Sequence, residues 1–196
     1  PNPDMMFYAS WSRGYRSGGF SPRAATAETA STPFGPETVD SYEVGSKLDL
    51  MNGMLQFNVA GFISKYDDLQ QNTTIPGGPT GNQTITSNVG SATIKGIEAD
   101  ASFRPVTGLR FNATLGLLDG EFDDFIAGNI LNGVILPFDY SANDPIYSPD
   151  ITASIGAEYS QPVSFGELVG TVGYRFIDKY DQQISLGPLT GDLVNG

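Results

Sequence analysis

Two carboxylates come closer than any other residues in this sequence to an arrangement that performs chemistry. Glu98 and Asp100 lie two residues apart in an alternating segment, so they share one face of a strand at about 7 Å. Carboxylates at such a separation can catalyse the hydrolysis of a glycosidic bond. The interpretation we favour is that both line a watery lumen and pair with Lys47, Arg104 or Arg110 of neighbouring strands.

A second group of carboxylates, in residues 119–124, has the ligand type that calcium prefers. Its spacing does not match an EF-hand loop, which needs acidic residues at alternate positions and a glycine at the sixth. We therefore interpret the segment as a solvated strand end. We expect no metal site and no cofactor in this chain.

Basic residues and glycines gather between Arg13 and Gly19. Such a combination can form a phosphate cradle, but the spacing differs from that of a P-loop and no helix pattern follows. We interpret the segment as part of an external loop whose arginines, Arg13 and Arg16, meet lipopolysaccharide or a ligand.

The composition excludes several classes of function. The chain has 196 residues, no histidine and no cysteine, and a formal net charge of −12. Without histidine and cysteine it lacks the commonest general base, the commonest transition-metal ligand and any disulfide. The acidic balance disfavours binding to nucleic acid, whose phosphates attract basic surfaces. We expect the chain not to be an enzyme.

Alternation of apolar and polar residues predicts the fold class. The segment Tyr42–Tyr66 forms two alternating runs around a turn at Asn52-Gly53, which is typical of a β-hairpin. The same period of two recurs along the chain and predicts seven strands. Their approximate ranges are Met5–Tyr15, the two halves of Tyr42–Tyr66, Thr84–Arg104, Leu109–Leu117, Ile151–Tyr159 and Leu168–Phe176.

The connections between the strands alternate in length. Short turns are expected at Met51–Gly53, Pro105–Gly108 and Gln161–Gly166, and long polar segments at Arg16–Glu37, Asp67–Gln83 and Asp119–Tyr147. Short turns on one side and long loops on the other are typical of a transmembrane β-barrel. We predict an all-β, antiparallel barrel portion with short periplasmic turns, long extracellular loops and interfacial aromatics that include Trp11, Tyr15, Tyr42, Tyr66, Phe103, Tyr159 and Tyr174.

Five blocks of the sequence resemble the barrel region of TonB-dependent outer-membrane receptors. They occur in the order that is found in that family and extend over most of residues 5–180. The blocks are Tyr8–Phe20, Pro36–Lys47, Phe62–Gln70, Asn88–Glu98 and Leu115–Phe122.

The resemblance implies a 22-stranded barrel in a bacterial outer membrane, filled by an amino-terminal plug that the TonB complex moves. Such a barrel needs roughly 600 residues, so seven strands are about a third of it. We expect residues 1–196 to be part of one barrel domain, without the plug and the barrel-closing strands. The expected partners are outer-membrane lipid, lipopolysaccharide, the TonB complex and a small ligand, most often a ferric siderophore, with cobalamin, haem and glycans as alternatives.

Aromatic, amide and basic residues of the long loops and strand ends are the candidates for ligand contact. They are Tyr15, Arg16, Tyr66, Gln70, Asn72, Tyr140 and Asn143.

Three other classes of protein fit parts of the pattern. A passive porin shares the alternation and the loop lengths, and lacks a plug. A soluble β-rich carbohydrate-binding domain shares the alternation, and folds in buffer without detergent. A glycosidase rests on Glu98 and Asp100 alone.

Overall fold

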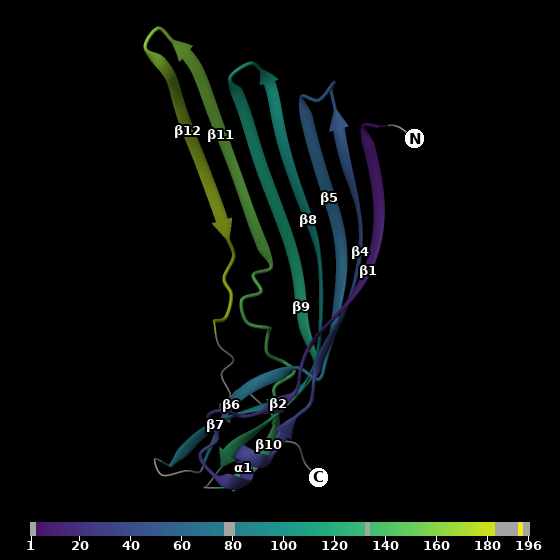
Figure 1. Ribbon diagram of the computed structural model, residues 1–196, viewed down its shortest axis with the longest axis vertical. Coiled ribbons are helices and arrows are strands. Elements are labelled where there is room, and N and C mark those ends of the chain that lie inside the picture. The colour runs from purple at the N-terminus through teal and green to yellow at the C-terminus, as the bar shows by residue number, and fades with distance from the viewer. Residues whose placement is uncertain (1–2, 77–80, 132–133, 183–191, 194–196) are drawn as a thin grey trace.

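The computed structural model describes residues 3–76, 81–131, 134–182 and 192–193. Long antiparallel strands form one curved sheet, and shorter elements gather at one end of it (Figure 1). The prediction of an all-β, antiparallel chain is confirmed. No helix among the described residues is long and apolar enough to cross a membrane.

Seven long strands make the main part of this nine-stranded sheet. Each pairs with the next long strand in antiparallel register, in the order β1-β4-β5-β8-β9-β11-β12. Each corresponds to one of the seven strands expected from the sequence, although the bounds of β8 and β9 differ from the expected ones. Their bounds are β1 Met5–Arg16, β4 Glu37–Leu50, β5 Leu55–Asp67, β8 Gly90–Val106, β9 Leu109–Leu131, β11 Ile151–Val163 and β12 Gly166–Ile177.

Three short turns join these strands in pairs at the end opposite the shorter elements (Figure 1). Between β4 and β5, Met51, Asn52 and Gly53 have φ values of 54°, 56° and 82°. Between β8 and β9, Gly108 has φ 84° and accepts a hydrogen bond from the amide of Ser160 at 2.8 Å. Positive φ values are the reason for glycine and asparagine in such turns. The expected short turns are therefore present.

The segments predicted as long loops contain structure of their own, which we call the cap. It comprises six short strands, one helix and the distal part of β9 beyond Leu118, with the intervening connections. Their bounds are β2 Gly19–Phe20, α1 Ala27–Ser31, β3 Pro33–Phe34, β6 Gln70–Pro76, β7 Asn82–Asn88, β10 Val134–Asp139 and β13 Asp192–Leu193. The long connections thus lie together at one end of the sheet, as expected, but are not irregular.

The strand expected over Thr84–Arg104 is in fact two strands. β7 pairs with β6 in the cap, and β8 pairs with β5 and β9 in the main sheet. The two are divided at Val89 and Gly90, where Gly90 has φ 148° and a Cβ would collide with the carbonyl oxygen of Asp124. Only Val89 separates the two strands, so no polar loop marks the break in the sequence.

The buried core lies in the cap and at the adjoining ends of β5 and β8, and not along the rest of the long strands. It consists of Val89, Ala92, Phe122, Phe125, Ala127, Phe138 and Tyr140, with Tyr66 and Leu69 packed against it. The ring of Phe125 packs against those of Phe122 and Tyr140 in tilted arrangements, with centroids 4.7 and 5.9 Å apart. By contrast, large apolar side chains of the long strands, such as Phe7 and Val172, are 72% exposed. A sheet of this kind requires an apolar surrounding on one face.

We predict that Gly90→Ala loosens the junction between sheet and cap. The substitution forces a Cβ into a strained φ and against a carbonyl, which costs about 1–3 kcal/mol. The amides of Leu69 and Ile126 donate to the carbonyls of Gly90 and Val89 at this junction. In the complete receptor in detergent, both amides should exchange hydrogen faster. Gly170→Ala is the control, because a Cβ there meets nothing within 4 Å. Unchanged exchange in Gly90→Ala would contradict the account of the junction.

Candidate functional site

The two faces of the long strands differ in chemistry, and the register shows how. Residues directly opposite one another form rows that run across the sheet. One such row is Ala9, Val44, Gly61, Ile97 and Leu117. We call the face that carries this row the outward face, and the opposite face the inward face.

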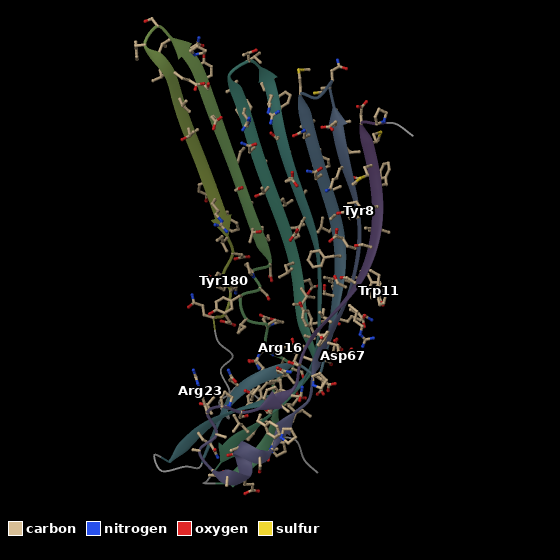
Figure 2. The ribbon with its side chains drawn as sticks, viewed as in Figure 1. Tyr8, Trp11, Arg16, Arg23, Asp67 and Tyr180 are labelled. Carbon is tan, nitrogen blue, oxygen red and sulfur yellow. The ribbon has the colours of Figure 1, made fainter. Side chains whose placement is uncertain are left out.

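The outward face is apolar over a band of regular width. On β5 the band extends from Leu55 to Ile63, which is about 27 Å along the strand. This length is of the order of the roughly 25 Å apolar band on outer-membrane barrels. At the turn end Phe103 pairs with Phe111, and at the cap end Trp11 pairs with Tyr42, as an interfacial aromatic girdle requires (Trp11 is labelled in Figure 2).

Charged side chains begin on the outward face where the apolar band ends. The Lys95 ammonium lies 3.0 Å from the Asp119 carboxylate and 3.9 Å from that of Glu121. On β1 and β4, Asp40 accepts a hydrogen bond from the Trp11 indole at 3.2 Å and lies 3.8 Å from Arg13. These exposed ion pairs contribute little to stability. They mark the level at which the outward face passes from hydrocarbon to polar surroundings.

The inward face carries a polar hollow of 450 Å³ along the middle of the strands. At one side of it the Tyr8 hydroxyl donates to Glu43 at 2.6 Å (Tyr8 is labelled in Figure 2). The Tyr8 ring crosses Gly45, where a Cβ would lie 2.6 Å from it, so glycine makes this contact possible. A wet inner wall opposite an apolar outer wall is the arrangement of a transmembrane barrel.

Glu98 and Asp100 both line this inward hollow. Asp100 accepts a hydrogen bond from the Asn58 amide at 2.9 Å. Among the described residues neither carboxylate has an ion-pair partner within 4.0 Å, so the expected salt bridges with Lys47, Arg104 or Arg110 are not formed. Lys47 lies on the same row as Asp100, but Asn58 stands between them and donates to Asp100 in its place, which periodicity alone did not predict.

Two of the predicted ligand contacts, Arg16 and Gln70, meet where the long strands enter the cap. Arg16 pairs with Glu37 at 2.7 Å and donates to the carbonyl of Gln70 at 2.8 Å (Arg16 is labelled in Figure 2). Glu37 also accepts from the Gln70 amide at 2.7 Å. The Gln70 side chain donates to the carbonyls of Ser17 and Gly35. These contacts tie together three segments of the cap, so both residues have a structural role.

Tyr66, Tyr140 and Asn143 come together at the aromatic core of the cap. Tyr140 is 0% exposed and Tyr66 packs against the same cluster. The Asn143 side chain donates to the Tyr140 carbonyl at 2.8 Å. Tyr140 is thus a core residue in this conformation, and Tyr66 belongs to the cap core and not to the aromatic girdle. A tyrosine in a polar segment gives no sequence signal that distinguishes these roles.

The remaining two candidates lie apart from the others. Asn72 is exposed on the β6–β7 hairpin and accepts a hydrogen bond from Thr86 at 2.8 Å. Tyr15 is 81% exposed and shares the outward face with Trp11, so it faces away from the barrel interior. Of the seven candidates, Asn72 is therefore the one with an exposed side chain on the cap surface away from both the junction and the core.

Sequence reasoning missed two residues that hold the cap in place. The Asn88 amide accepts from the backbone of Gly35 at 2.7 Å and donates to the carbonyl of Asp68 at 2.6 Å. Gln83 is buried and accepts from Thr29 and from the backbone of Ala25. Asn88 is the first residue of a block that carries the family resemblance, and this was the one sequence signal that could have identified it. No sequence signal identified Gln83.

A short turn fixes Tyr140 in the core. The Asp139 carboxylate accepts from the backbone and the hydroxyl of Ser141, at 2.9 and 2.6 Å. The Ser141 hydroxyl in turn accepts from the buried amide of Phe125 at 2.8 Å. The hydrogen bond from the Ser141 side chain, together with that from its amide, lowers the pKa of Asp139 from its ordinary value.

Comparison with known proteins agrees with this geometry. Residues 1–191 match the family described as TonB dependent receptor-like, beta-barrel. The pesticin receptor of Yersinia enterocolitica serotype O:8 / biotype 1B is 28% identical over 147 residues, which cover 67% of this chain and 21% of that protein. A curved antiparallel sheet with one apolar face, one polar face and an external cap defines part of an outer-membrane β-barrel. The chain belongs to the TonB-dependent receptor-like β-barrel family.

Two solved structures share this fold. The ferric yersiniabactin uptake receptor FyuA from Yersinia pestis has a TM-score of 0.70 and 21% identity, covering 93% of this chain and 26% of FyuA. The copper transporter OprC has a TM-score of 0.63 and 18% identity, covering 90% of this chain and 24% of OprC. The chain thus spans about a quarter of the length of the relatives that it matches. The family places it in the bacterial outer membrane.

We predict that Ser141→Ala weakens the core of the cap. The change leaves the amide of Phe125, a residue that is 1% exposed, without its acceptor, which costs about 1–3 kcal/mol. In the complete receptor, hydrogen exchange at Phe125 and Tyr140 should accelerate. Ser31→Ala is the matched control, since its exposed hydroxyl donates only to the carbonyl of Glu28. Equal exchange in both variants would argue against this role of Ser141.

The same turn predicts a dependence on pH. Because the pKa of Asp139 is lower in the folded state, its contribution is present above the ordinary value of 3.8 and is lost as the pH falls through the folded value. Protection of the Phe125 amide, corrected for intrinsic exchange, should decline over that acidic range. Asp139→Asn should make the decline shallower, and an identical pH profile in this variant would rule the effect out.

Proposed function

We propose that this chain is part of a receptor that takes up a scarce ligand across the outer membrane with energy from the TonB complex. The observation that carries the proposal is the match of residues 1–191 to the family, on a sheet whose two faces separate lipid from a watery interior. A ferric siderophore is the ligand class that we favour, because FyuA is a ferric yersiniabactin uptake receptor. The copper transporter OprC shares the fold, so a copper complex is the alternative cargo.

In this proposal the cap and the inward face of the long strands have different roles. The cap receives the ligand outside the cell, and the polar inward face lines the route through the barrel. No step needs a covalent reaction, and we propose that the chain is not an enzyme. A plug elsewhere in the complete protein closes the route, and the TonB complex displaces it.

We further propose that residues 1–196 form one section of a single barrel domain of 22 strands. Among the described strands, β1 pairs only with β4 and β12 only with β11, so each has a backbone edge without a partner. Such edges cannot face hydrocarbon, because each unsatisfied amide and carbonyl group there costs several kcal/mol. Further strands of the barrel satisfy them, and seven strands are about a third of the barrel.

Of the predicted ligand contacts, Asn72 is the residue that we retain as a direct contact. Its amide is exposed on the cap surface, although it accepts one hydrogen bond from Thr86. Arg16 and Gln70 influence the ligand through the position of the cap, because their polar groups hold its segments together. Tyr66, Tyr140 and Asn143 support the core beneath. Tyr15 faces the membrane boundary.

The proposal predicts energy-dependent uptake. Cells that produce the complete receptor should accumulate radioactive iron supplied as the ferric yersiniabactin complex, and cells without an active TonB complex should not. A passive porin predicts the same uptake in both strains. Glu98→Gln should leave uptake unchanged, because the carboxylate has no catalytic role. Loss of a glycan-cleaving activity in that variant would favour the glycosidase hypothesis instead.

If ferric yersiniabactin is not accumulated but a copper complex is, with the same dependence on TonB, the receptor class stands and the siderophore assignment falls. If neither complex shows dependence on TonB, the proposed function is wrong.

A further inference from the structure

The inward face carries a second hollow at the end of the sheet where the short turns lie. Its volume is 410 Å³, and it is lined by the β4–β5 turn, the β8–β9 turn and β11. Its charged lining groups are the guanidinium groups of Arg104 and Arg110 and the carboxylate of Glu158. The register places all three residues on the inward face. Because short turns of outer-membrane barrels face the periplasm, the hollow lies at the periplasmic mouth of the barrel.

A β-bulge brings the two arginines side by side. The register of β8 and β9 shifts at this point, so that two residues of β8, Arg104 and Pro105, lie opposite Arg110 of β9. Arg104 and Arg110 are therefore cross-strand neighbours on one face. Like charges directly opposite one another on a sheet are destabilising. An anion between the two guanidinium groups would remove this repulsion.

The part of the chain that the structure describes supplies no such anion. No carboxylate in it lies within 4.0 Å of Arg104 or Arg110, and neither side chain makes a hydrogen bond there. Glu158 of β11 is the register partner of Arg110, but it also lies beyond this distance. Both arginine side chains are exposed, so their donors are accessible. The planar fork of a guanidinium group fits a carboxylate through two parallel hydrogen bonds.

The distribution of charge along the inward face indicates from which side an anion reaches the pair. The hollow in the middle of the strands is lined by the carboxylates of Glu43, Glu98 and Asp100 and by the ammonium group of Lys47. This excess of negative charge repels anions from the middle of the wall. The hollow at the mouth has two guanidinium groups and one carboxylate. An anion from the periplasmic side reaches the mouth without passing the acidic part of the wall.

We propose that Arg104 and Arg110 form a binding site for a carboxylate-bearing anion at the periplasmic mouth of the barrel. An anion with two or more carboxylates fits best, because each guanidinium group can then hold one of them in a bidentate pair. The volume of the hollow is within the range of small-molecule sites. The proposal rests on the outer-membrane assignment and is independent of the cargo.

Two sources can supply the carboxylates. One is a small polycarboxylate in the periplasm, and the other is an acidic side chain of the receptor outside residues 1–196. The chemistry at the two guanidinium groups is the same in both cases, and the two arms of the experiment distinguish them.

Isothermal titration calorimetry of the complete receptor in an uncharged detergent tests the free anion, with citrate as the probe. The unchanged receptor should bind citrate, and should bind acetate much more weakly, because one carboxylate cannot form a bidentate pair with both groups. Arg104→Gln and Arg110→Gln should each weaken citrate binding about tenfold, through the loss of one charge-assisted pair. Arg104→Lys should weaken it less, since the charge remains.

Arg175→Gln is the matched control. Arg175 is an exposed arginine of the inward face on β12, and it does not line the hollow. This variant should bind citrate as the unchanged receptor does. Removal of one of two adjacent like charges relieves repulsion, so Arg104→Gln and Arg110→Gln should fold normally.

Cross-linking with a carbodiimide tests the second source. The reagent activates a carboxylate, and the amine introduced by Arg104→Lys attacks the activated carbon, so that an amide forms and the carbodiimide leaves as its urea. Glu158→Gln is combined with this variant, which removes the neighbouring carboxylate of the hollow. A cross-linked peptide from outside residues 1–196, in a receptor that binds no citrate, assigns the site to a carboxylate of the receptor itself.

A receptor that neither binds citrate nor forms this cross-link overturns the site. An equal loss of citrate binding in Arg104→Gln and Arg175→Gln also overturns it, because the general charge of the inward face would then be sufficient. Uptake separates this proposal from the transport function. TonB-dependent uptake by a receptor that fails both tests refutes the site alone, whereas absent uptake by a receptor that binds citrate at the two arginines refutes the transport function alone.

Discussion

Pairing of the backbone in hydrocarbon is the constraint on which the rest of this structure depends. A membrane interior offers no water to amide and carbonyl groups, so each strand must be bonded to its neighbours along its spanning length. The continuous registers from β1 to β12 meet this requirement within the described sheet. Register also assigns each residue to a face. A shift of one residue would place Ala60 and Phe62 on the outward face instead of Gly61 and Ile63, and would move Lys65 to the inward face.

The position of the hydrophobic core follows from the same constraint. Lipid provides the apolar environment for the outward face, so the long strands need no second layer of protein against them. The cap lies in water and must bury apolar groups of its own, which Phe125 and Tyr140 do at 1% and 0% exposure. Polar groups around that core are fully engaged: the described residues contain no buried side-chain nitrogen or oxygen without a hydrogen-bond partner. The ordered cap can therefore present a fixed surface at the mouth of the barrel.

Alternation in the sequence was sufficient to predict the central parts of the long strands, the short turns and the two faces, because a period of two is a local property. The cap was not predictable in this way. β6 and β7 are polar, and distant residues hold the cap in place: Asn88 bonds to Gly35, and Gln83 to Thr29. The same limit applies to the candidate site. Tyr140 and Asn72 look alike as polar loop residues, and contact with Phe125, which is distant in sequence, decides that one is buried.

The measurement that tests the central claim most directly is the accessibility of spin labels along β5 in the complete receptor, reconstituted in bilayers. This chain contributes no cysteine of its own, so single cysteines can be placed at successive positions from Leu55 to Lys65. Spin labels at Phe57, Val59, Gly61 and Ile63 should collide mainly with oxygen, which is concentrated in lipid. Labels at the residues between them and at Lys65 should collide mainly with a water-soluble nickel complex. A profile without a period of two, or with the two faces reversed, would contradict a membrane-spanning sheet with this orientation.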